Sequence, residues 1–281
     1  MNGFKIKSNA KINLALNVIE KTSKLHKIES IISFIGLHDL IFINMTDNKD
    51  HKVSFIGKFS ENISKINTVT TLLKLLDQKK FLGGKKFKIK IIKNIPQKSG
   101  LGGGSMNAAA LINFFIKKKI IKLKKKELLK LTRMIGSDVI FGIKPKNTIL
   151  SSNGKIRKFS KKINIHTLIV KPNFGCSTKY IYSNFKKFSK SHFNLPKQSM
   201  FKMNYLRGLK NDLEKVALNK YSKLKKIKSF LSTLPNNTFV RMSGSGSSIV
   251  AYFQSKKACV NAYKQFKGKF SSDWCVISKT I

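Results

Sequence analysis

A dense run of glycines, Gly100-Leu-Gly-Gly-Gly104, is the clearest chemical signal in the sequence. The strand-like segment Phe87–Ile95 precedes it, and an alanine-rich, helix-forming segment begins at Ser105. Glycines let the backbone adopt positive φ angles and let a ligand approach the main chain without meeting Cβ atoms. The first amides of a helix have no intrahelical partner, and the helix dipole adds partial positive charge there. The sequence therefore predicts an anion pocket at this point, most often one for phosphate.

This loop differs from two familiar nucleotide-binding loops. No Gly-Lys-Ser/Thr closes it, so it is not a Walker A motif. It is not a G-x-G-x-x-G dinucleotide loop either, because Ser105 and Met106 follow Gly104 directly. A flexible linker is the alternative interpretation, but a strand and a helix flank the glycines directly, which favours phosphate binding.

Carboxylates are scarce, since the sequence has 12 Asp and Glu against 57 Lys and Arg. Asp138 is the only acid between Glu127 and Asp212, and it follows a predicted helix and precedes an apolar run. There it can accept a proton from a hydroxyl group that attacks the γ-phosphate of a nucleotide. It can equally be a turn residue at the helix end, a position that Asp favours. The residues alone leave these two interpretations open.

The formal net charge of +45 raises the question of nucleic-acid binding, because contacts of Lys and Arg to phosphate dominate that affinity. Only four of the basic residues are Arg, however, and the lysines are spread along the whole chain. Arg supplies the forked contacts to phosphate and guanine that nucleic-acid sites tend to use. We therefore expect a solvated basic surface rather than a specific nucleic-acid site.

The remaining composition fits a globular protein, with 281 residues of which 41% are hydrophobic. No run approaches the roughly 20 apolar residues that span a bilayer, and the N-terminal residues lack the apolar core of a signal peptide. The three cysteines, Cys176, Cys259 and Cys275, are widely spaced and show no metal-ligand pattern. We expect reduced thiols in a cytoplasmic protein that does not span a membrane.

Hydrophobic periodicity predicts the elements that position the loop. Ser105 suits the N-cap of the helix after the loop. The first half is expected to contain strands over 4–18, 28–43 (broken near Gly36), 52–56 and 87–95, and helices over 69–76, 105–118 and 125–134. The second half is expected to contain strands over 166–170, 239–242, 248–253 and 274–277, and helices over 178–185, 201–219, 222–234 and from 256. This mixture predicts an α+β protein with two lobes, over residues 1–150 and 151–281.

Five segments resemble motifs of the GHMP small-molecule kinases, the superfamily of galactokinase, homoserine kinase and mevalonate kinase. The glycine loop is similar to the pattern P-x-x-x-G-L-G-G-G-S-S of that superfamily. The other segments, in chain order, are Asn9–Leu16, Ile135–Val139, Asn211-Asp212 and Met242–Ser248. The resemblance covers nearly the full chain. It implies the two-lobed GHMP fold, with an N-terminal lobe like domain 2 of ribosomal protein S5 and a ferredoxin-like C-terminal lobe.

The resemblance also implies ATP and Mg²⁺ as cofactors and assigns the reacting groups. Asp138 is implied as the catalytic base, and Lys11 as the cation that keeps it ionised. Ser105 is the implied hydroxyl for phosphate or Mg²⁺ at the helix start. The implied ATP-binding residues are Pro96, Lys98, Ser99, Gly100, Leu101, Gly102, Gly103, Gly104, Ser105, Gly244 and Ser245.

Within the superfamily, three of these segments, Asn9–Leu16, Ile135–Val139 and Asn211-Asp212, are most similar to kinases of cytidine diphosphate methylerythritol in the non-mevalonate isoprenoid pathway. That resemblance implies that His26 hydrogen-bonds cytosine and that Tyr182 stacks on it, with Asn13 and Thr178 also contacting substrate. It implies a monomer or homodimer with a small-molecule partner. The alternatives are another GHMP kinase, of homoserine or mevalonate type, or a basic nucleic-acid-binding protein.

Four positions depart from the family pattern. Leu25 replaces a tyrosine that would form the second face of the cytosine sandwich, and Met106 replaces a second serine after the glycines. Ile140 stands where proline is usual. Lys98 stands where a small residue is usual, and it can either reach the nucleotide phosphates as a point charge or point to solvent like most lysines of this chain.

Overall fold

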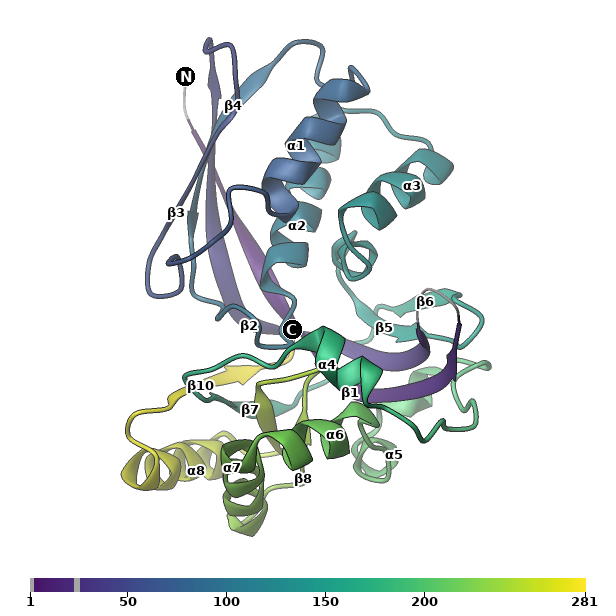
Figure 1. Ribbon diagram of the computed structural model, residues 1–281, viewed down its shortest axis with the longest axis vertical. Coiled ribbons are helices and arrows are strands. Elements are labelled where there is room, and N and C mark those ends of the chain that lie inside the picture. The colour runs from purple at the N-terminus through teal and green to yellow at the C-terminus, as the bar shows by residue number, and fades with distance from the viewer. Residues whose placement is uncertain (1–2, 23–25) are drawn as a thin grey trace. The chain divides into compact units, whose positions relative to one another are not determined.

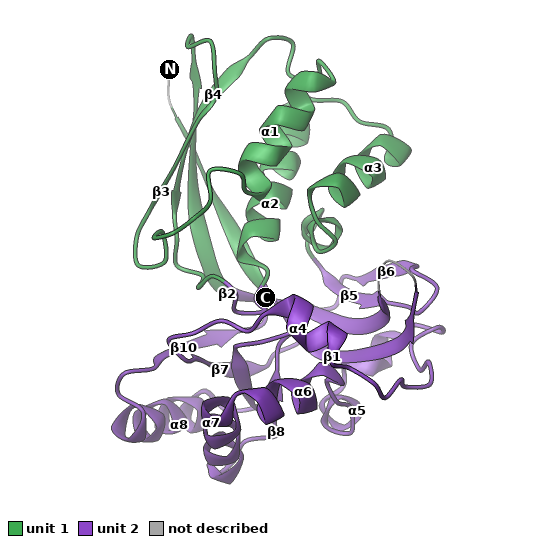
Figure 2. Cartoon of the chain, viewed as in Figure 1, with its two compact units in different colours: residues 1–10, 37–97, 102–145 green, residues 11–36, 98–101, 146–281 purple. Residues whose placement is uncertain are grey.

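The computed structural model describes residues 3–22 and 26–281 and contains helices and two β-sheets. The chain folds as two compact units, drawn in different colours in Figure 2. Unit 1 comprises Met1–Ala10, Leu37–Gln97 and Gly102–Pro145, and unit 2 comprises Lys11–Gly36, Lys98–Leu101 and Lys146–Ile281. The polypeptide therefore passes between the units several times, and the glycine loop contributes residues to both.

Unit 1 packs helices against a sheet (Figure 1). The apolar side chains of its strands and helices form one core, which includes Ile41, Ile89, Leu72 and Phe115. Strand β2 (His26–Thr46) pairs antiparallel with β4 (Lys86–Ile92), which pairs parallel with β3 (Lys52–Ile56), while β1 (Phe4–Lys21) also pairs with β2. The helices are α1 (Thr68–Gln78), α2 (Gly103–Lys117), α3 (Lys125–Ile135) and the 3₁₀ helix η1 (Val139–Gly142).

Unit 2 contains the other ends of β1 and β2 and a second sheet with the strand order β10-β7-β9-β8. Its core joins this sheet to helices α6, α7 and α8 through residues such as Leu168, Leu213 and Phe266. The strands are β5 (Asn147–Leu150), β6 (Ile156–Phe159), β7 (His166–Lys171), β8 (Phe239–Met242), β9 (Ile249–Phe253) and β10 (Trp274–Lys279). The helices are α4 (Thr178–Ser183), η2 (Gln198–Phe201), α5 (Met203–Arg207), α6 (Leu213–Lys220), α7 (Ser222–Thr233) and α8 (Lys256–Lys269).

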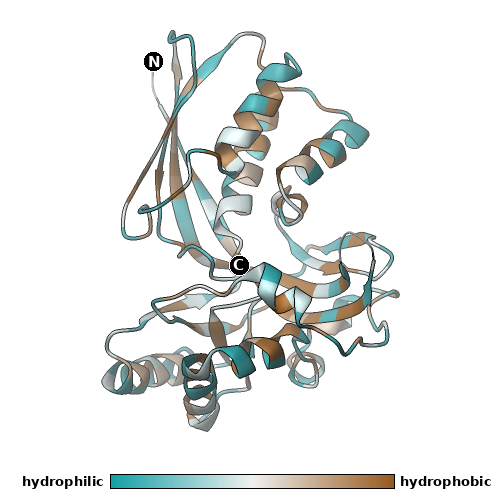
Figure 3. Cartoon of the chain, viewed as in Figure 1, coloured by the Kyte–Doolittle hydropathy of each residue, from teal (hydrophilic) through white to brown (hydrophobic). Residues whose placement is uncertain are grey.

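Most expected elements are present at nearly the predicted residues, because their hydrophobic period is strong; Figure 3 shows the apolar residues along them. Three expectations were wrong. Strand β2 continues through Gly36 without a break, and the single helix expected over 201–219 is divided into η2, α5 and α6. Ser105 is the third residue of α2 rather than its N-cap, which is Gly102. The β5–β6 hairpin was not predicted, since each of its strands has only four residues.

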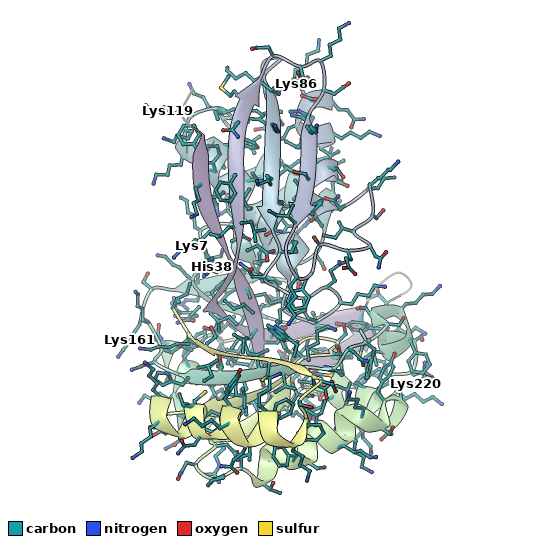
Figure 4. All side chains as sticks on the ribbon, turned by 90° about the vertical axis from the view of Figure 1, so that its left-hand side faces the viewer. Lys7, His38, Lys86, Lys119, Lys161 and Lys220 are labelled. Atoms are coloured by element: carbon teal, nitrogen blue, oxygen red, sulfur yellow. The ribbon has the colours of Figure 1, made fainter. Side chains whose placement is uncertain are left out.

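The lysines are distributed over the surface, as the sequence predicts. Lys119, Lys161 and Lys220, labelled in Figure 4, are exposed and come from widely separated parts of the chain. Among the described residues, no helix is long and apolar enough to cross a membrane.

Candidate functional site

Four successive carbonyl groups of the glycine loop, from Lys98 to Leu101, accept hydrogen bonds within unit 2. The donors to Lys98 O and Ser99 O are the amides of Ser247 at 3.3 Å and Ser248 at 3.1 Å. The donors to Gly100 O and Leu101 O are Ser243 Oγ at 3.0 Å and Lys11 N at 3.0 Å. A loop that binds an anion must keep its carbonyl oxygens away from the ligand, because they would repel it. These hydrogen bonds engage all four.

Gly100 occupies a position that only glycine tolerates. Its φ is +76°, and a Cβ built on it would lie 2.0 Å from Ser243 O and 3.2 Å from Gly246 O. Gly244, with a φ of +56°, also lies close to Gly100, since a Cβ there would be 3.4 Å from Gly100 O. The expected positive φ angles are confirmed at Gly100 and Gly102, the group close to Gly100 is the 243–246 turn, and approach of a ligand to the loop stays a prediction.

Lys98 adopts a left-handed backbone conformation with a φ of +49°. This region costs a residue with a Cβ about 1–2 kcal/mol, and glycine alone avoids that cost. The side chain of Lys98 is exposed. Gly175 packs against it, because a Cβ built on Gly175 would lie 2.5 Å from the Cβ of Lys98. The proposed contact of Lys98 with phosphate stays a prediction.

The second part of the loop begins α2 in unit 1 (Figure 1). The N-cap Gly102 has a φ of +71°, and no described side chain caps this end of the helix by a hydrogen bond. Gly104 O accepts a hydrogen bond from Thr68 Oγ1 at 2.7 Å, which ties the first turn of α2 to the start of α1. The uncapped amides and the helix dipole make this terminus suitable for an anion.

A buried ionic cluster holds the strand that enters the loop. Asp39 is fully buried, and its Oδ1 accepts from the amides of Asn94 and Ile95, both at 2.8 Å. Its Oδ2 contacts Lys93 Nζ and accepts from Asn107 Nδ2 of α2 at 3.0 Å. The carboxylate thus fixes the end of β4 to α2 on either side of the glycines. Sequence reasoning missed this cluster, because Asp39 is one of 12 acids in the chain and its position inside an apolar strand does not indicate a partner.

Asp138 lies between α3 and η1 and is partly buried. The preceding turn packs close to the start of α2, because a Cβ built on Gly136 would be 3.8 Å from Ser105 Oγ. Gly142 of η1 contacts α2 as well, through Met106. Two sequence-predicted residues, Ser105 and Asp138, therefore belong to one packed region of unit 1.

Lys11 and Asn13 lie on the same face of β1 in unit 2, as their spacing predicts. Both are 4% exposed, and Lys11 Nζ donates to Asn13 Oδ1 at 2.7 Å. Asn13 Nδ2 donates to Ser30 Oγ at 2.8 Å, and Asn13 N donates to Ser243 Oγ at 3.2 Å. Lys11 is thus a buried cation in a polar network, unlike the surface lysines. Its pairing with Asp138 of unit 1 stays a prediction.

His26 and Tyr182 lie side by side in unit 2, with their ring centroids 5.0 Å apart and the planes inclined at 39°. His26 Nε2 is buried and has no hydrogen-bond partner among the described residues. Burial, and secondly the charge of Lys21, lower the pKa of His26 from its usual 6.5. A neutral imidazole with a free ring nitrogen can pair with a polar ring edge of a ligand.

Thr178 and Ser245, two further predicted site residues, contact each other through their hydroxyl oxygens at 2.8 Å. Thr178 begins α4, which also carries Tyr182. Leu25, the position expected to close the cytosine pocket, lies outside the described residues.

Two family models match the chain. The model of the GHMP kinase N-terminal domain matches residues 67–145, and that of the C-terminal domain matches residues 184–272. The first includes the glycine loop and Asp138, and the second includes the 243–248 turn. Fold and loop thus define a GHMP kinase architecture.

Curated relatives narrow the class. A 4-diphosphocytidyl-2-C-methyl-D-erythritol kinase of Pelagibacter ubique is 66% identical over 281 residues, all of both chains. A kinase of the same name from Caldanaerobacter subterraneus is 31% identical over 99% of this chain and 97% of its own. The chain therefore belongs to the 4-diphosphocytidyl-2-C-methyl-D-erythritol kinase family of GHMP kinases.

Solved structures confirm the fold. A 4-(cytidine 5'-diphospho)-2C-methyl-D-erythritol kinase superposes with a TM-score of 0.77 at 20% identity, over 98% of this chain and 99% of that one. A homoserine kinase from Cytophaga hutchinsonii superposes with a TM-score of 0.72 at 16% identity, over 100% of this chain and 95% of that one. The expected family and α+β GHMP fold are thus confirmed, whereas the roles of individual residues stay predictions.

Proposed function

We propose that the protein transfers the γ-phosphoryl group of ATP to the 2-hydroxyl of 4-diphosphocytidyl-2-C-methyl-D-erythritol, in the non-mevalonate route to isoprenoid precursors. The observation that carries the proposal is the identity of 66% with a kinase of this name along the whole chain. The glycine loop, with its carbonyl groups engaged by unit 2, supports the phosphate-binding part of the proposal.

The loop from Pro96 to Ser105 would bind the ATP phosphates. Its second half supplies the uncapped amides of α2, and the positive end of the helix dipole favours the β- and γ-phosphates. Gly244 and Ser245 would complete this site from the turn that supports Gly100.

When bound, Mg²⁺ would supply positive charge against the negative charge that develops on the phosphate groups during transfer. Ser105 Oγ is the protein group proposed to hold it. No group of three His, Cys, Asp or Glu suited to a metal occurs among the residues that the structure describes. The hydroxyl of Ser105 is an oxygen ligand, the type that Mg²⁺ takes, and Mg²⁺ binds few protein groups beside substrate phosphates and water.

Asp138 would act as the general base. As the acceptor oxygen attacks the γ-phosphorus, its proton passes to the Asp138 carboxylate, the bond to the β-phosphate oxygen breaks, and ADP leaves. Lys11, whose ammonium group is oriented by Asn13, would favour the ionised carboxylate and the negative charge on the attacking oxygen.

The cytidine end of the substrate would bind between unit 2 side chains. His26 has a buried ring nitrogen without a described partner, which suits the polar edge of cytosine. Tyr182, next to it, would stack on the base, and Thr178 and Asn13 would contact the rest of the substrate.

Cytoplasmic location is part of the same proposal. All three cysteines are free and buried, and free thiols are typical of a reducing compartment. A monomer or homodimer and the absence of a specific nucleic-acid partner stay predictions from the sequence.

A substrate panel tests the proposal. Purified protein would be incubated with ATP, Mg²⁺ and either the cytidyl substrate, homoserine or mevalonate, with ADP release and ³¹P NMR of the product as readouts. We expect ADP release with the cytidyl substrate alone and a new phosphomonoester signal at its 2-position. Turnover of homoserine or mevalonate in preference to it would overturn the substrate assignment, and salt-sensitive RNA binding without ATP turnover would favour the nucleic-acid alternative.

A further inference from the structure

Asn211, in the Asn-Asp pair between α5 and α6, is a buried amide whose hydrogen bonds are all directed at backbone. Its side chain is 4% exposed. Nδ2 donates to Met242 O and to Gly244 O, both at 2.8 Å, and Oδ1 accepts from Leu213 N at 3.1 Å. Both N–H groups of the amide and its oxygen are thus used. The residue joins the start of α6 to the turn after β8.

The turn that Asn211 holds contacts the glycine loop directly. Ser243 lies between the two carbonyl groups bound by Asn211, and its Oγ donates to Gly100 O at 3.0 Å. The same oxygen accepts from Asn13 N at 3.2 Å. Ser243 therefore links the glycine loop to β1, and Asn211 fixes the carbonyl groups of the residues before and after Ser243.

We propose that Asn211 is a positioning residue for the ATP-phosphate loop and acts through Ser243. The proposal rests on the proposed function, because it assigns the loop to ATP. Asn211 does not itself lie in the loop. It determines where Ser243 Oγ stands, and Ser243 Oγ determines the orientation of the Gly100 peptide.

An amide is the side chain that this role requires. Asn presents two N–H donors from one nitrogen to the two carbonyl groups, whereas a carboxylate would repel both of them. Alanine would leave two carbonyl groups without these donors in a buried place. Loss of such bonds commonly changes an equilibrium by a factor of roughly 5 to 150.

The neighbouring residue of the pair gives a matched control. Asp212 Oδ2 accepts from Val18 N at 2.8 Å, and Asp212 N donates to Leu16 O at 2.9 Å. Asp212 thus supports a later part of β1 and makes no described contact with the 243–248 turn. Asp212→Ala should lower thermal stability without a selective effect on nucleotide binding.

The test is a double-mutant cycle of Asn211→Ala and Ser243→Ala, with binding of the non-hydrolysable ATP analogue AMPPNP and of adenosine measured well below each thermal midpoint. We expect Asn211→Ala to weaken AMPPNP at least fivefold, by roughly the loss of one buried hydrogen bond, and adenosine less than twofold. Because both residues act on one peptide group, the double variant should bind AMPPNP about as weakly as the weaker single variant.

The proposal would be overturned if the losses of AMPPNP affinity in the two single variants multiplied in the double variant. It would also be overturned if Asn211→Ala weakened the binding of AMPPNP and of adenosine equally. The same would follow if Asp212→Ala weakened AMPPNP as much as Asn211→Ala. Asn211→Ser, which keeps a hydroxyl for Leu213 N, replaces Asn211→Ala in the cycle if the latter does not fold. Failure of the wild-type protein to phosphorylate the cytidyl substrate would refute the proposed function instead, since AMPPNP binding is measured without an acceptor.

Discussion

The buried pair of Lys93 and Asp39 predicts a large and specific loss of stability when only one charge is removed. In Lys93→Met, the carboxylate of Asp39 stays fully buried but loses its cation. It keeps three donors, the amides of Asn94 and Ile95 and the Nδ2 of Asn107. Breaking a buried pair from one side costs about 3–5 kcal/mol, and the surviving donors place the expected loss near the lower end, about 3 kcal/mol.

Urea unfolding measures this loss. If the free energy of unfolding falls by about 3 kcal/mol per molar urea, the urea concentration at the unfolding midpoint should fall by roughly 1 M. Lys93→Met/Asp39→Asn should recover most of it, since a neutral amide oxygen can still accept from the two backbone amides and no charge stays buried. We expect the double variant to unfold within about 1 kcal/mol of the wild type.

A second pair in unit 1 provides the control. Lys86 Nζ lies 2.6 Å from Asp77 Oδ2, but the side chains are 22% and 29% exposed. Lys86→Met should therefore cost no more than about 1 kcal/mol. Equal losses of unfolding free energy in Lys86→Met and Lys93→Met would refute the reasoning from burial. The same would follow if Lys93→Met/Asp39→Asn lost as much stability as its two single variants together.

Four further predictions concern the site. Asp138→Asn should keep ATP binding and lower kcat by about 10²–10⁴-fold; near wild-type turnover in a folded variant would remove Asp138 from the mechanism. His26→Ala should weaken binding of the cytidyl substrate by about 1–3 kcal/mol, seen as a higher KM for that substrate, and leave the ATP KM unchanged. Equal effects on both KM values would make His26 structural. Since burial lowers the pKa of His26, the imidazole should be neutral at neutral and alkaline pH, and the wild-type substrate KM should rise as the pH falls through this lowered pKa and the ring becomes protonated. Lys98→Ala should raise the ATP KM at low ionic strength, with a smaller effect at high salt; an unchanged KM at low salt would assign Lys98 to the surface.

The sequence was sufficient for features that depend on neighbouring residues. The glycine loop, the strand before it and helix α2 all have local signals, namely glycine spacing and hydrophobic period. The division of the helix expected over 201–219 was not predicted, although Gly208 and the Asn211-Asp212 pair in the gap between α5 and α6 are poor helix formers. The break coincides with Asn211, whose side chain bonds to Met242 and Gly244, far away in the sequence.

Buried polar residues were the hardest to predict. A lone lysine on a strand is usually exposed, so Lys11 was singled out only by family resemblance, and the structure shows it 4% exposed. Asp39 and Lys93 carried no signal of their own, since their partnership depends on β2 and β4 being adjacent in the sheet. Charge pairs of this kind depend on tertiary contacts rather than on local spacing.

The four engaged carbonyl groups of residues 98–101 also bear on the order in which the protein folds. Three of their donors come from residues 243–248, and Ser243 and Gly100 are separated by 143 positions. Contacts between such distant residues close large chain loops, which makes them slow to form. During synthesis the glycine loop leaves the ribosome long before residues 243–248, which donate three of these hydrogen bonds. The emerging chain should therefore gain affinity for ATP only after nearly all of it has been translated, and nucleotide binding should report the completion of folding.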